Sequence, residues 1–229
     1  MDNNISQETN KEQPFDDAAV NYPEALNELA GQKTRLTYLK GETLFKQGAF
    51  APFVLYVVKG LVKIYLQTGY DKQLNLGIAQ TGDFLAFSSV FGANIHTYSC
   101  QALKDCEICM IEKESLKQAL LNNPQFALEI TSKNYRIEGH LLDIIKNLGY
   151  KQMRGKLASA LLYLSQEHFL KEDVFNFLTR QDLSDFASIS TESAIKFLKE
   201  FEKEGIISLH GRKIEVTDLK RLEIISKTS

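Results

Sequence analysis

The chain has 229 residues, of which 44% are hydrophobic and 24% are charged, proportions close to those of an ordinary globular protein. Its 27 Lys+Arg and 29 Asp+Glu give a net charge of −2, which excludes a uniformly basic, histone-like protein but leaves room for a local positive patch. The length allows one large domain or two small ones.

The first residues of the sequence are not expected to act as a targeting signal. Residues 1–17 are rich in Asn, Gln, Glu and Asp and contain no apolar stretch, so we expect a disordered tail there and a short helix over 18–31. Three cysteines argue against a secreted disulfide scaffold, and no segment approaches the roughly 20 apolar residues of a membrane span. We therefore expect a cytoplasmic protein with no membrane contact.

Residues 34–111 have the pattern of an all-β unit. Short β-rich runs alternate with glycines at a spacing typical of tight turns. Eight runs are visible: RLTYL, ETLFKQ, FVLYVV, LVKIYLQ, QLNLGIA, FLAF, HTYSCQAL and EICMI. Eight strands of this length suit a jelly roll.

From Pro124 the period changes to that of a helix. Apolar residues recur every seven positions in two series offset by three, an a/d heptad pattern with one polar residue at an a position. This favours a parallel two-stranded coiled coil over the alternative, an amphipathic helix packed on its own domain. The seam residues are Ile130, Asn134, Ile137, Leu141, Ile144 and Leu148.

Gly149 interrupts this helical pattern and predicts a hinge at a domain boundary. A second amphipathic helix is expected over 151–168.

Residues 179–205 hold the densest signal in the chain. Thr179 and Asp182 have capping-box spacing and predict the start of a helix. Ser190 is a good N-cap for a second helix, and Gly205 is its C-terminal stop. The buried side of that second helix is expected to comprise Ala194, Ile195, Leu198, Phe201 and Ile206.

Two helices joined by the short turn Ser188-Ile189-Ser190 have helix-turn-helix geometry. The following IISLHGRKIEV places two β-branched runs around Gly211 and predicts a β-hairpin, the wing of a winged helix. An ordinary pair of helices in a bundle is the alternative, and the wing argues against it.

Taken together, these motifs resemble the CRP/FNR family of dimeric bacterial transcription regulators. The N-terminal match is KGETLFKQGAFAPFVLYVVKGLVKIY followed by TGDF, and the C-terminal match is LTRQDLSDFASISTESAIKFLKEFEKEGIISLHGRKIEV. The resemblance implies an α+β architecture. Its parts are a cyclic-nucleotide-binding-like β-roll over 18–123, a dimerisation helix over 124–148 and a winged helix-turn-helix domain over 149–229.

The resemblance also implies which residues meet DNA. Base contacts fall on Thr191, Glu192 and Lys196. The family often has arginine at the first and last of these positions, so we expect a different DNA site. Phosphate contacts fall on Thr179, Arg180, Gln181, Ser190, Lys199, His210 and Gly211.

The implied partners are double-stranded DNA with an inverted-repeat site, a second copy of the chain, and RNA polymerase. Residues 149–229 hold 13 Lys+Arg and 12 Asp+Glu. A positive surface there requires Glu200, Glu202 and Glu204 to point away from DNA.

The sensor half departs from the cAMP-binding members. Their Gly-Glu pair falls here on Ala86 and Phe87, and their Arg-Ser/Thr pair falls on His96 and Thr97. Without a bidentate guanidinium a cyclic phosphate has no strong anchor, so we expect no cAMP binding. The candidate pocket for an unidentified small-molecule effector comprises Phe84, Ala86, Phe87, His96, Thr97 and Leu141.

Two other kinds of sensing, and a regulator that needs no ligand, remain open. Cys100, Cys106 and Cys109 could act in redox or metal sensing, but Cys106 and Cys109 should lie on opposite faces of one strand. We therefore favour buried core cysteines and predict no metal site. His96 and His140 are possible haem ligands, although structural roles are commoner for single histidines.

The sequence lacks a GxSxG motif, a phosphate loop and an HExxH motif. We therefore predict that the protein is not an enzyme. The rival classes are the regulatory nucleotide-binding module of a kinase or channel, which lacks a winged helix, and a structural homologue that has lost DNA binding.

Overall fold

The computed structural model describes Leu26, residues 33–70 and residues 72–228. The predicted tail over 1–17 and the predicted helix over 18–31, apart from Leu26, lie outside the described residues. Within this part of the chain, no helix is long and apolar enough to cross a membrane.

The N-terminal half is a β-roll of two four-stranded antiparallel sheets, as the eight β-rich runs predict. The first sheet has the order β1-β8-β3-β6 and the second the order β2-β7-β4-β5. The strands are β1 (Lys33–Tyr38), β2 (Thr43–Phe45), β3 (Phe53–Lys59), β4 (Leu61–Gly69), β5 (Lys72–Gln80), β6 (Phe84–Leu85), β7 (Ser99–Ala102) and β8 (Cys106–Glu112).

The link between β3 and β4 shows why glycine is needed at a tight turn of the roll. Gly60 has φ +117°, a conformation that side chains rarely adopt. A Cβ atom there would also lie 2.5 Å from Cys106 Sγ and 2.9 Å from its Cα. The chain can therefore pass this closely over β8 only with a residue that has no side chain.

Three helical segments close the roll on one flank: η2 (Phe87–Phe91), α2 (Lys113–Asn122) and α3 (Pro124–Tyr150). Sequence reasoning did not anticipate α2. The start of α3 at Pro124 is confirmed, with the Asn123 side chain accepting a hydrogen bond from Phe126 N at 3.0 Å. The predicted break at Gly149 is wrong by two residues, because the helix continues to Tyr150 and ends where Lys151 adopts extended backbone.

The C-terminal half contains six helical segments and the predicted hairpin. The expected helix over 151–168 is divided, since Ser165 ends α4 and α5 begins after Gln166. The last helix, α8, was not predicted. The elements are α4 (Met153–Leu164), α5 (Glu167–Lys171), η3 (Val174–Asn176), α6 (Arg180–Ala187), α7 (Thr191–Lys203), β9 (Ile207–His210), β10 (Lys213–Val216) and α8 (Leu219–Thr228).

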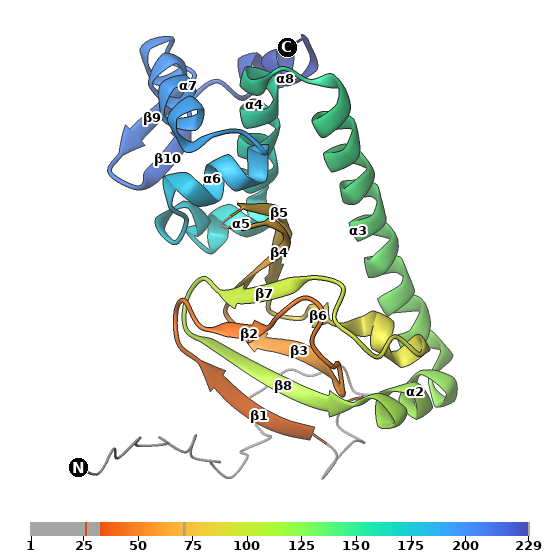
Figure 1. Cartoon of the computed structure of the whole chain (residues 1–229). Coiled ribbons are helices and arrows are strands. Elements are labelled where there is room, and N and C mark those ends of the chain that lie inside the picture. Colours follow the sequence, from red (N-terminus) through yellow and green to blue (C-terminus); the bar gives the residue numbers. More distant parts are fainter. Residues whose placement is uncertain (1–25, 27–32, 71, 229) are drawn as a thin grey trace, which may run out of the picture.

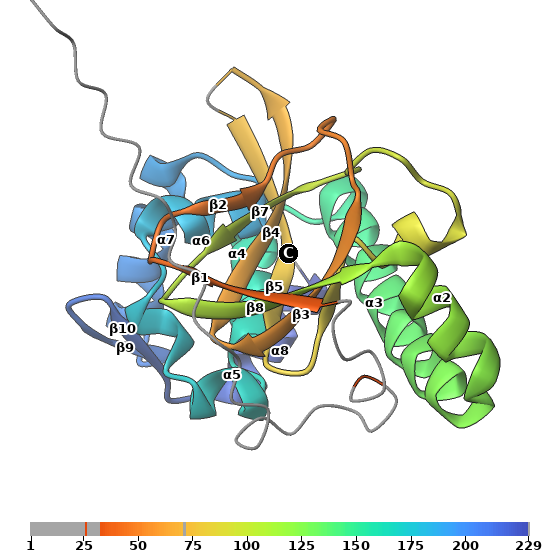
Figure 2. The ribbon, with the colours of Figure 1, turned by 90° about the horizontal axis from the view of Figure 1, so that it is seen from below.

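The two halves share one apolar core. Leu61, Ile78 and Leu103 of the roll belong to the same buried cluster as Leu161 and Phe201 of the C-terminal domain. That domain sits over the β4–β5 side of the roll, and α3 rises from the opposite flank to reach it (Figure 1). Seen from below, α2 and α3 lie on one side of the roll and α6 and α7 on the other (Figure 2).

Candidate nucleic-acid interface and sensor site

The first motif helix, α6, begins with a complete capping box. Thr179 Oγ1 accepts from Asp182 N at 3.0 Å, and the Asp182 carboxylate accepts from Thr179 N at 2.8 Å. This reciprocal pairing confirms the helix start predicted from the sequence, and it fixes the backbone of the Thr179-Arg180-Gln181 turn.

The turn between the helices takes the expected shape without a glycine. Ser188 has φ 50° and ψ 49°, in the left-handed region, and ends α6. Ile189 N then donates to Ser184 O at 3.1 Å, and the Ile189 side chain packs against the core. A non-glycine residue in this region is uncommon, so the packing of Ile189 and the next helix must hold it there.

The second motif helix, α7, presents a polar face to solvent. Ser190 caps its start by accepting from Ser193 N at 3.2 Å. Ala194, Leu198 and Phe201 are buried beneath it. The prediction that Ile195 points inward is wrong: it is 39% exposed, because it lies at the edge of the stripe that these three residues define. The side chains of this outer face are Glu192, Ile195, Lys196 and Lys199.

Several residues expected to meet DNA contact one another. Gln181 Nε2 donates to Asp185 Oδ1 at 2.8 Å, and Gln181 Oε1 accepts from Thr191 Oγ1 at 2.5 Å. Arg180 donates to the backbone O of Gly211 in the wing at 2.8 Å. The first turn of α6, the start of α7 and the wing are thereby linked in one surface.

Other candidates lie along the edges of that surface. His210 is exposed on the wing, with Nε2 2.8 Å from Ser208 Oγ. Lys199 is exposed about two turns along α7 from Thr191 and Glu192. At Glu192, hydrogen bonds from its own backbone N–H and from the Ser190 side chain lower the pKa of the carboxyl.

Of the three glutamates expected to point away from DNA, Glu202 of α7 and the C-cap residue Glu204 are engaged away from the outer face. Glu204 accepts from Arg154 at 2.7 and 2.9 Å and from Arg221 at 3.1 Å. Glu202 accepts from Leu209 N at 3.3 Å. Glu200 is the exception, since its carboxylate lies 3.9 Å from Lys196 Nζ, and it partly offsets that charge.

The expected effector residues do not converge on one point in the roll. The rings of Phe84 and Phe87 lie 5.9 Å apart and pack toward α2 and α3, where Phe84 contacts Phe126. Ala86 is buried with φ 57°, and its N–H donates to Tyr98 Oη at 2.8 Å. Thr97 is exposed.

His96 occupies the position of the missing arginine and is buried against Phe45, which belongs to a different core cluster from the one that Phe84 and Phe87 pack on. Its ring stacks on Phe45 with centroids 3.7 Å apart. Burial, helped by the charge of Lys113, lowers the pKa of the imidazole. The neutral ring therefore predominates at pH 7 and supplies no fixed positive charge for a phosphate.

All three cysteines are buried and free. Cys106 and Cys109 belong to different core clusters on the two faces of β8, as their spacing predicts. Among the described residues, no group of three His, Cys, Asp or Glu side chains could hold a metal ion. His140 is engaged by the roll, where Nε2 donates to Leu76 O at 2.9 Å.

Helix α3 leaves an apolar stripe without a partner in the described chain. Ile137, Leu141 and Leu148 of the predicted seam are exposed, and Ile145 extends the stripe. Ile144 is half-buried. The assignment of Ile130 to the seam is corrected, because it is 4% exposed in the chain's own core beside Phe126. The Asn134 side chain lies outside the described residues.

Two family models match the chain in this order. The cyclic nucleotide-binding domain matches residues 35–123, and the Crp-like helix-turn-helix domain matches residues 155–225. The chain belongs to the CRP/FNR family. It is thus a DNA-binding transcription regulator with a cyclic-nucleotide-binding fold, and the α+β architecture predicted from the sequence is confirmed.

Curated relatives carry the same combination. The chain is 26% identical over 183 residues to the cAMP-activated global transcriptional regulator CRP of Salmonella typhimurium, covering 78% of this chain and 87% of the relative. It is 23% identical over 208 residues to the CRP-like cAMP-activated global transcriptional regulator of Mycobacterium tuberculosis, covering 87% and 91%.

Solved structures share the fold. FixK2 from Bradyrhizobium japonicum aligns with a TM-score of 0.69 at 21% identity, covering 86% of this chain and 98% of that one. The c-di-GMP responsive regulator CLP of Xanthomonas campestris aligns with a TM-score of 0.73 at 20% identity, covering 84% and 97%.

Proposed function

We propose that this CRP/FNR-family chain is a homodimer that binds an inverted-repeat DNA site through α7. The observation that carries the proposal is the exposed polar face of α7, flanked by the capped turn of α6 on one side and by the wing on the other. A face of this kind fits the major groove, while its neighbours lie within reach of the backbone.

Each side chain then has a chemical role. Lys196 donates to guanine O6 and N7, Glu192 accepts from cytosine N4, and Thr191 contacts a base or a methyl group. Thr179, Arg180 and Gln181, with Ser190, Lys199, His210 and Gly211, hold phosphates and set the register. We also propose RNA polymerase as a partner, which the family resemblance implies.

The exposed stripe on α3 supports the dimer. A regular row of aliphatic side chains along a long helix is expected to pair with a second helix. The row runs through Ile137, Leu141, Ile145 and Leu148. In such a dimer the two α7 helices enter successive major grooves about 34 Å apart.

For the effector, we propose that this regulator does not respond to cAMP, although the two curated relatives described above are named as cAMP-activated. Phe84 and Phe87 pack with Phe126, and His96 carries no fixed charge. A more apolar ligand, or no ligand, fits this roll. Thiol sensing is disfavoured because burial raises the pKa of the Cys100 and Cys106 thiols.

The test is a binding selection from random-sequence duplexes with the full chain. We expect the enriched duplexes to contain an inverted repeat whose half-sites are about 10 bp apart, or a multiple of that, centre to centre. Enrichment of single, unpaired sites would contradict the dimer, and no enrichment would contradict sequence-specific binding.

A further inference from the structure

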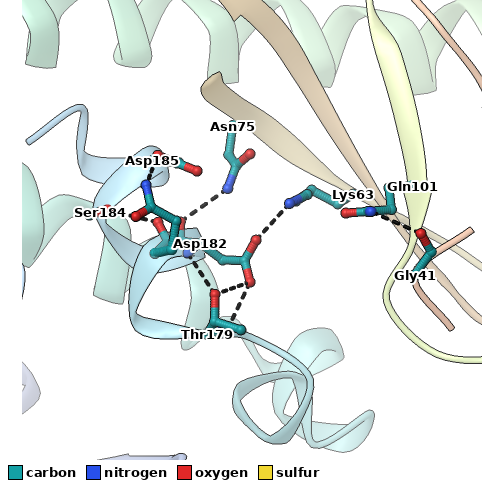
Figure 3. A network of polar contacts seen from close by, with 9 residues as sticks. Gly41, Lys63, Asn75, Gln101, Thr179, Asp182, Ser184 and Asp185 are labelled. Atoms are coloured by element: carbon teal, nitrogen blue, oxygen red, sulfur yellow. Dashed lines mark hydrogen bonds and ion pairs between the residues drawn. The ribbon is translucent and has the colours of Figure 1, made fainter. Parts of the chain in front are cut away.

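An ion pair joins the two domains at a buried position. Nζ of Lys63 on β4 lies 2.6 Å from Oδ1 of Asp182 on α6, and the residues are 5% and 8% exposed (Figure 3). They are 119 residues apart, so the pair exists only while the domains are docked. A buried charge that loses its partner is strongly unfavourable, so each residue restricts where the other can lie.

The carboxylate end of this pair is stabilised in its charged form. Burial by itself raises the pKa of Asp182, but the charge of Lys63 and hydrogen bonds from Lys63 and Thr179 outweigh it, and the pKa lies below its ordinary value. The Asp182 carboxylate is therefore ionised at neutral pH.

A second strand holds the same turn of α6. Nδ2 of Asn75 on β5 donates to the backbone O of Asp182 at 3.0 Å, and Asn75 is also buried. Asp182 is thus held through both its side chain and its main chain, each by a residue of the roll.

The neighbouring residues of β5 bind the two helices that carry the domain. Leu76 O accepts from His140 on α3 at 2.9 Å, and Ile78 N donates to Tyr163 Oη on α4 at 3.1 Å. Residues 75–78 therefore connect α3, α4 and α6 at one place.

Beyond this point the hairpin and α6 separate. A polar cavity of about 350 Å³ lies between them, lined by Lys63, Gln67, Gln73, Gln181, Asp182 and Asp185. The polar connection between the β4–β5 hairpin and α6 is thus concentrated at Lys63 and Asn75.

Asp182 lies within the turn that is proposed to bind phosphate. Its second carboxylate oxygen accepts from Thr179 N at 2.8 Å and from Thr179 Oγ1 at 2.6 Å. Thr179 and Gln181, which precede Asp182 in this turn, are exposed, whereas Asp182 itself faces the roll (Figure 3). Lys63 therefore binds this turn on its buried side, and the outer side stays accessible to DNA.

We propose that Lys63 is a positioning residue for DNA recognition. By holding Asp182 it fixes the angle of α6 and α7 relative to the roll, and so determines which spacing of half-sites the dimer accepts. This inference rests on the proposed function, because a preferred spacing exists only for a dimer on an inverted repeat.

The physical reason is geometric. Two recognition helices bind one duplex simultaneously only if their separation matches the site, and the second contact is then effectively intramolecular. If the DNA-binding domain can rotate relative to the roll, the dimer binds half-sites at several separations. At none of them does it gain the full affinity of an intramolecular second contact. Rigid attachment therefore appears as discrimination between spacings and not as affinity for one half-site.

The experiment compares the full-length wild type with Lys63→Met on duplexes that carry two selected half-sites at spacings varied in single base pairs, and on a single half-site. The wild type should prefer one spacing by about tenfold, and Lys63→Met by about threefold or less. Affinity for the single half-site should be unchanged.

A matched control lies at the same domain boundary. Lys104 pairs with Glu172 at the end of α5, so Lys104→Met also removes an interdomain ion pair without touching α6. This variant should keep the spacing preference of the wild type. If it relaxes the preference as much as Lys63→Met does, the effect is general loosening of the interface and the inference is wrong.

The double variant Lys63→Met/Asp182→Asn removes both charges and leaves no unpaired charge. It should also lose the spacing preference. Recovery of the preference in the double variant would overturn the inference, because the effect would then come from a stranded carboxylate. If the wild type itself shows no preferred spacing, the proposed dimeric function fails. If the wild type has a preferred spacing and Lys63→Met keeps it, this inference fails and the proposed function stands.

Discussion

In the C-terminal domain, the side chains aligned with DNA contacts in the family lie at the surface, whereas the aligned nucleotide-binding positions of the roll hold aromatic, aliphatic and neutral groups. Thr179 and Gln181 are exposed and hydrogen-bonded. Phe87 packs against the core, and His96 is buried on Phe45.

This difference shows how the two halves of one fold can diverge separately. A capped helix pair with a polar outer face can keep its recognition chemistry, because that chemistry depends on local backbone geometry. A small-molecule pocket depends on a few charged groups, and replacing those groups by apolar ones leaves the roll well packed. We therefore infer that DNA recognition is retained while the signal differs.

The largest effect is expected from a variant that breaks the proposed dimer. Ile137→Asp places a charge on the exposed stripe of α3, and at 51% exposure the residue contributes little to the chain's own core. The variant should be monomeric and should lose at least about 100-fold in affinity for an inverted repeat, because the second contact is no longer intramolecular.

Analytical ultracentrifugation measures the first effect and fluorescence anisotropy the second. Leu128→Asp is the control, since Leu128 is 65% exposed and lies on the opposite side of α3, nine residues away. It should remain dimeric. A stable dimer of Ile137→Asp would place the interface elsewhere.

A smaller effect is expected in the pH dependence of stability at His140, where α3 contacts the roll. Burial lowers the pKa of His140, against the opposing hydrogen bond to Leu76 O and the charge of Asp143. The unfolded chain binds a proton at His140 more readily than the folded chain does. The contribution of neutral His140 to the free energy of unfolding is therefore complete above the unfolded pKa of about 6.5 and declines as the pH falls below it.

Thermal unfolding between about pH 7.5 and 5.5 should therefore show a smaller acid-induced loss in His140→Gln than in the wild type. Glutamine keeps a donor for Leu76 O and does not titrate. His96, whose pKa is also lowered, is common to both proteins and cancels in the difference. Identical slopes in the two proteins would show that His140 does not couple protonation to folding.

The smallest expected effect is none at all, and it tests the sensor side of the comparison. Calorimetric titration of the full chain with cAMP should give no stoichiometric signal in the micromolar range, because the roll offers no guanidinium for the phosphate. A tight one-to-one signal would contradict our interpretation of Phe87 and His96.

The elements whose signals are local were predictable from the sequence. The capping box at Thr179, the N-cap at Ser190 and the hairpin around Gly211 depend on neighbours within four residues, and all three are present. The opposite placement of Cys106 and Cys109 followed from strand periodicity in the same way.

Features that depend on distant partners were missed. In the sequence, Lys63 is one polar residue among others in a predicted strand. It is buried because the C-terminal domain, whose Asp182 is 119 residues away in the chain, packs over it. Helix α8 has a short, highly charged sequence and is ordered by packing Leu222 and Ile225 into the shared core. Ile130 fits a heptad as well as it fits the core, and only the position of the roll decides between them.

The central claim is that α7 reads bases while the turn at the start of α6 holds phosphates. It is tested most directly by parallel binding selections on Lys196→Ala and Arg180→Ala. Lys196→Ala should cost about 1–3 kcal/mol and relax the preference at one base pair in each half-site. Arg180→Ala should weaken all sequences alike and reduce the salt slope by about one unit. If Arg180→Ala changes the preferred bases while Lys196→Ala leaves them intact, the assignment of the recognition surface is wrong.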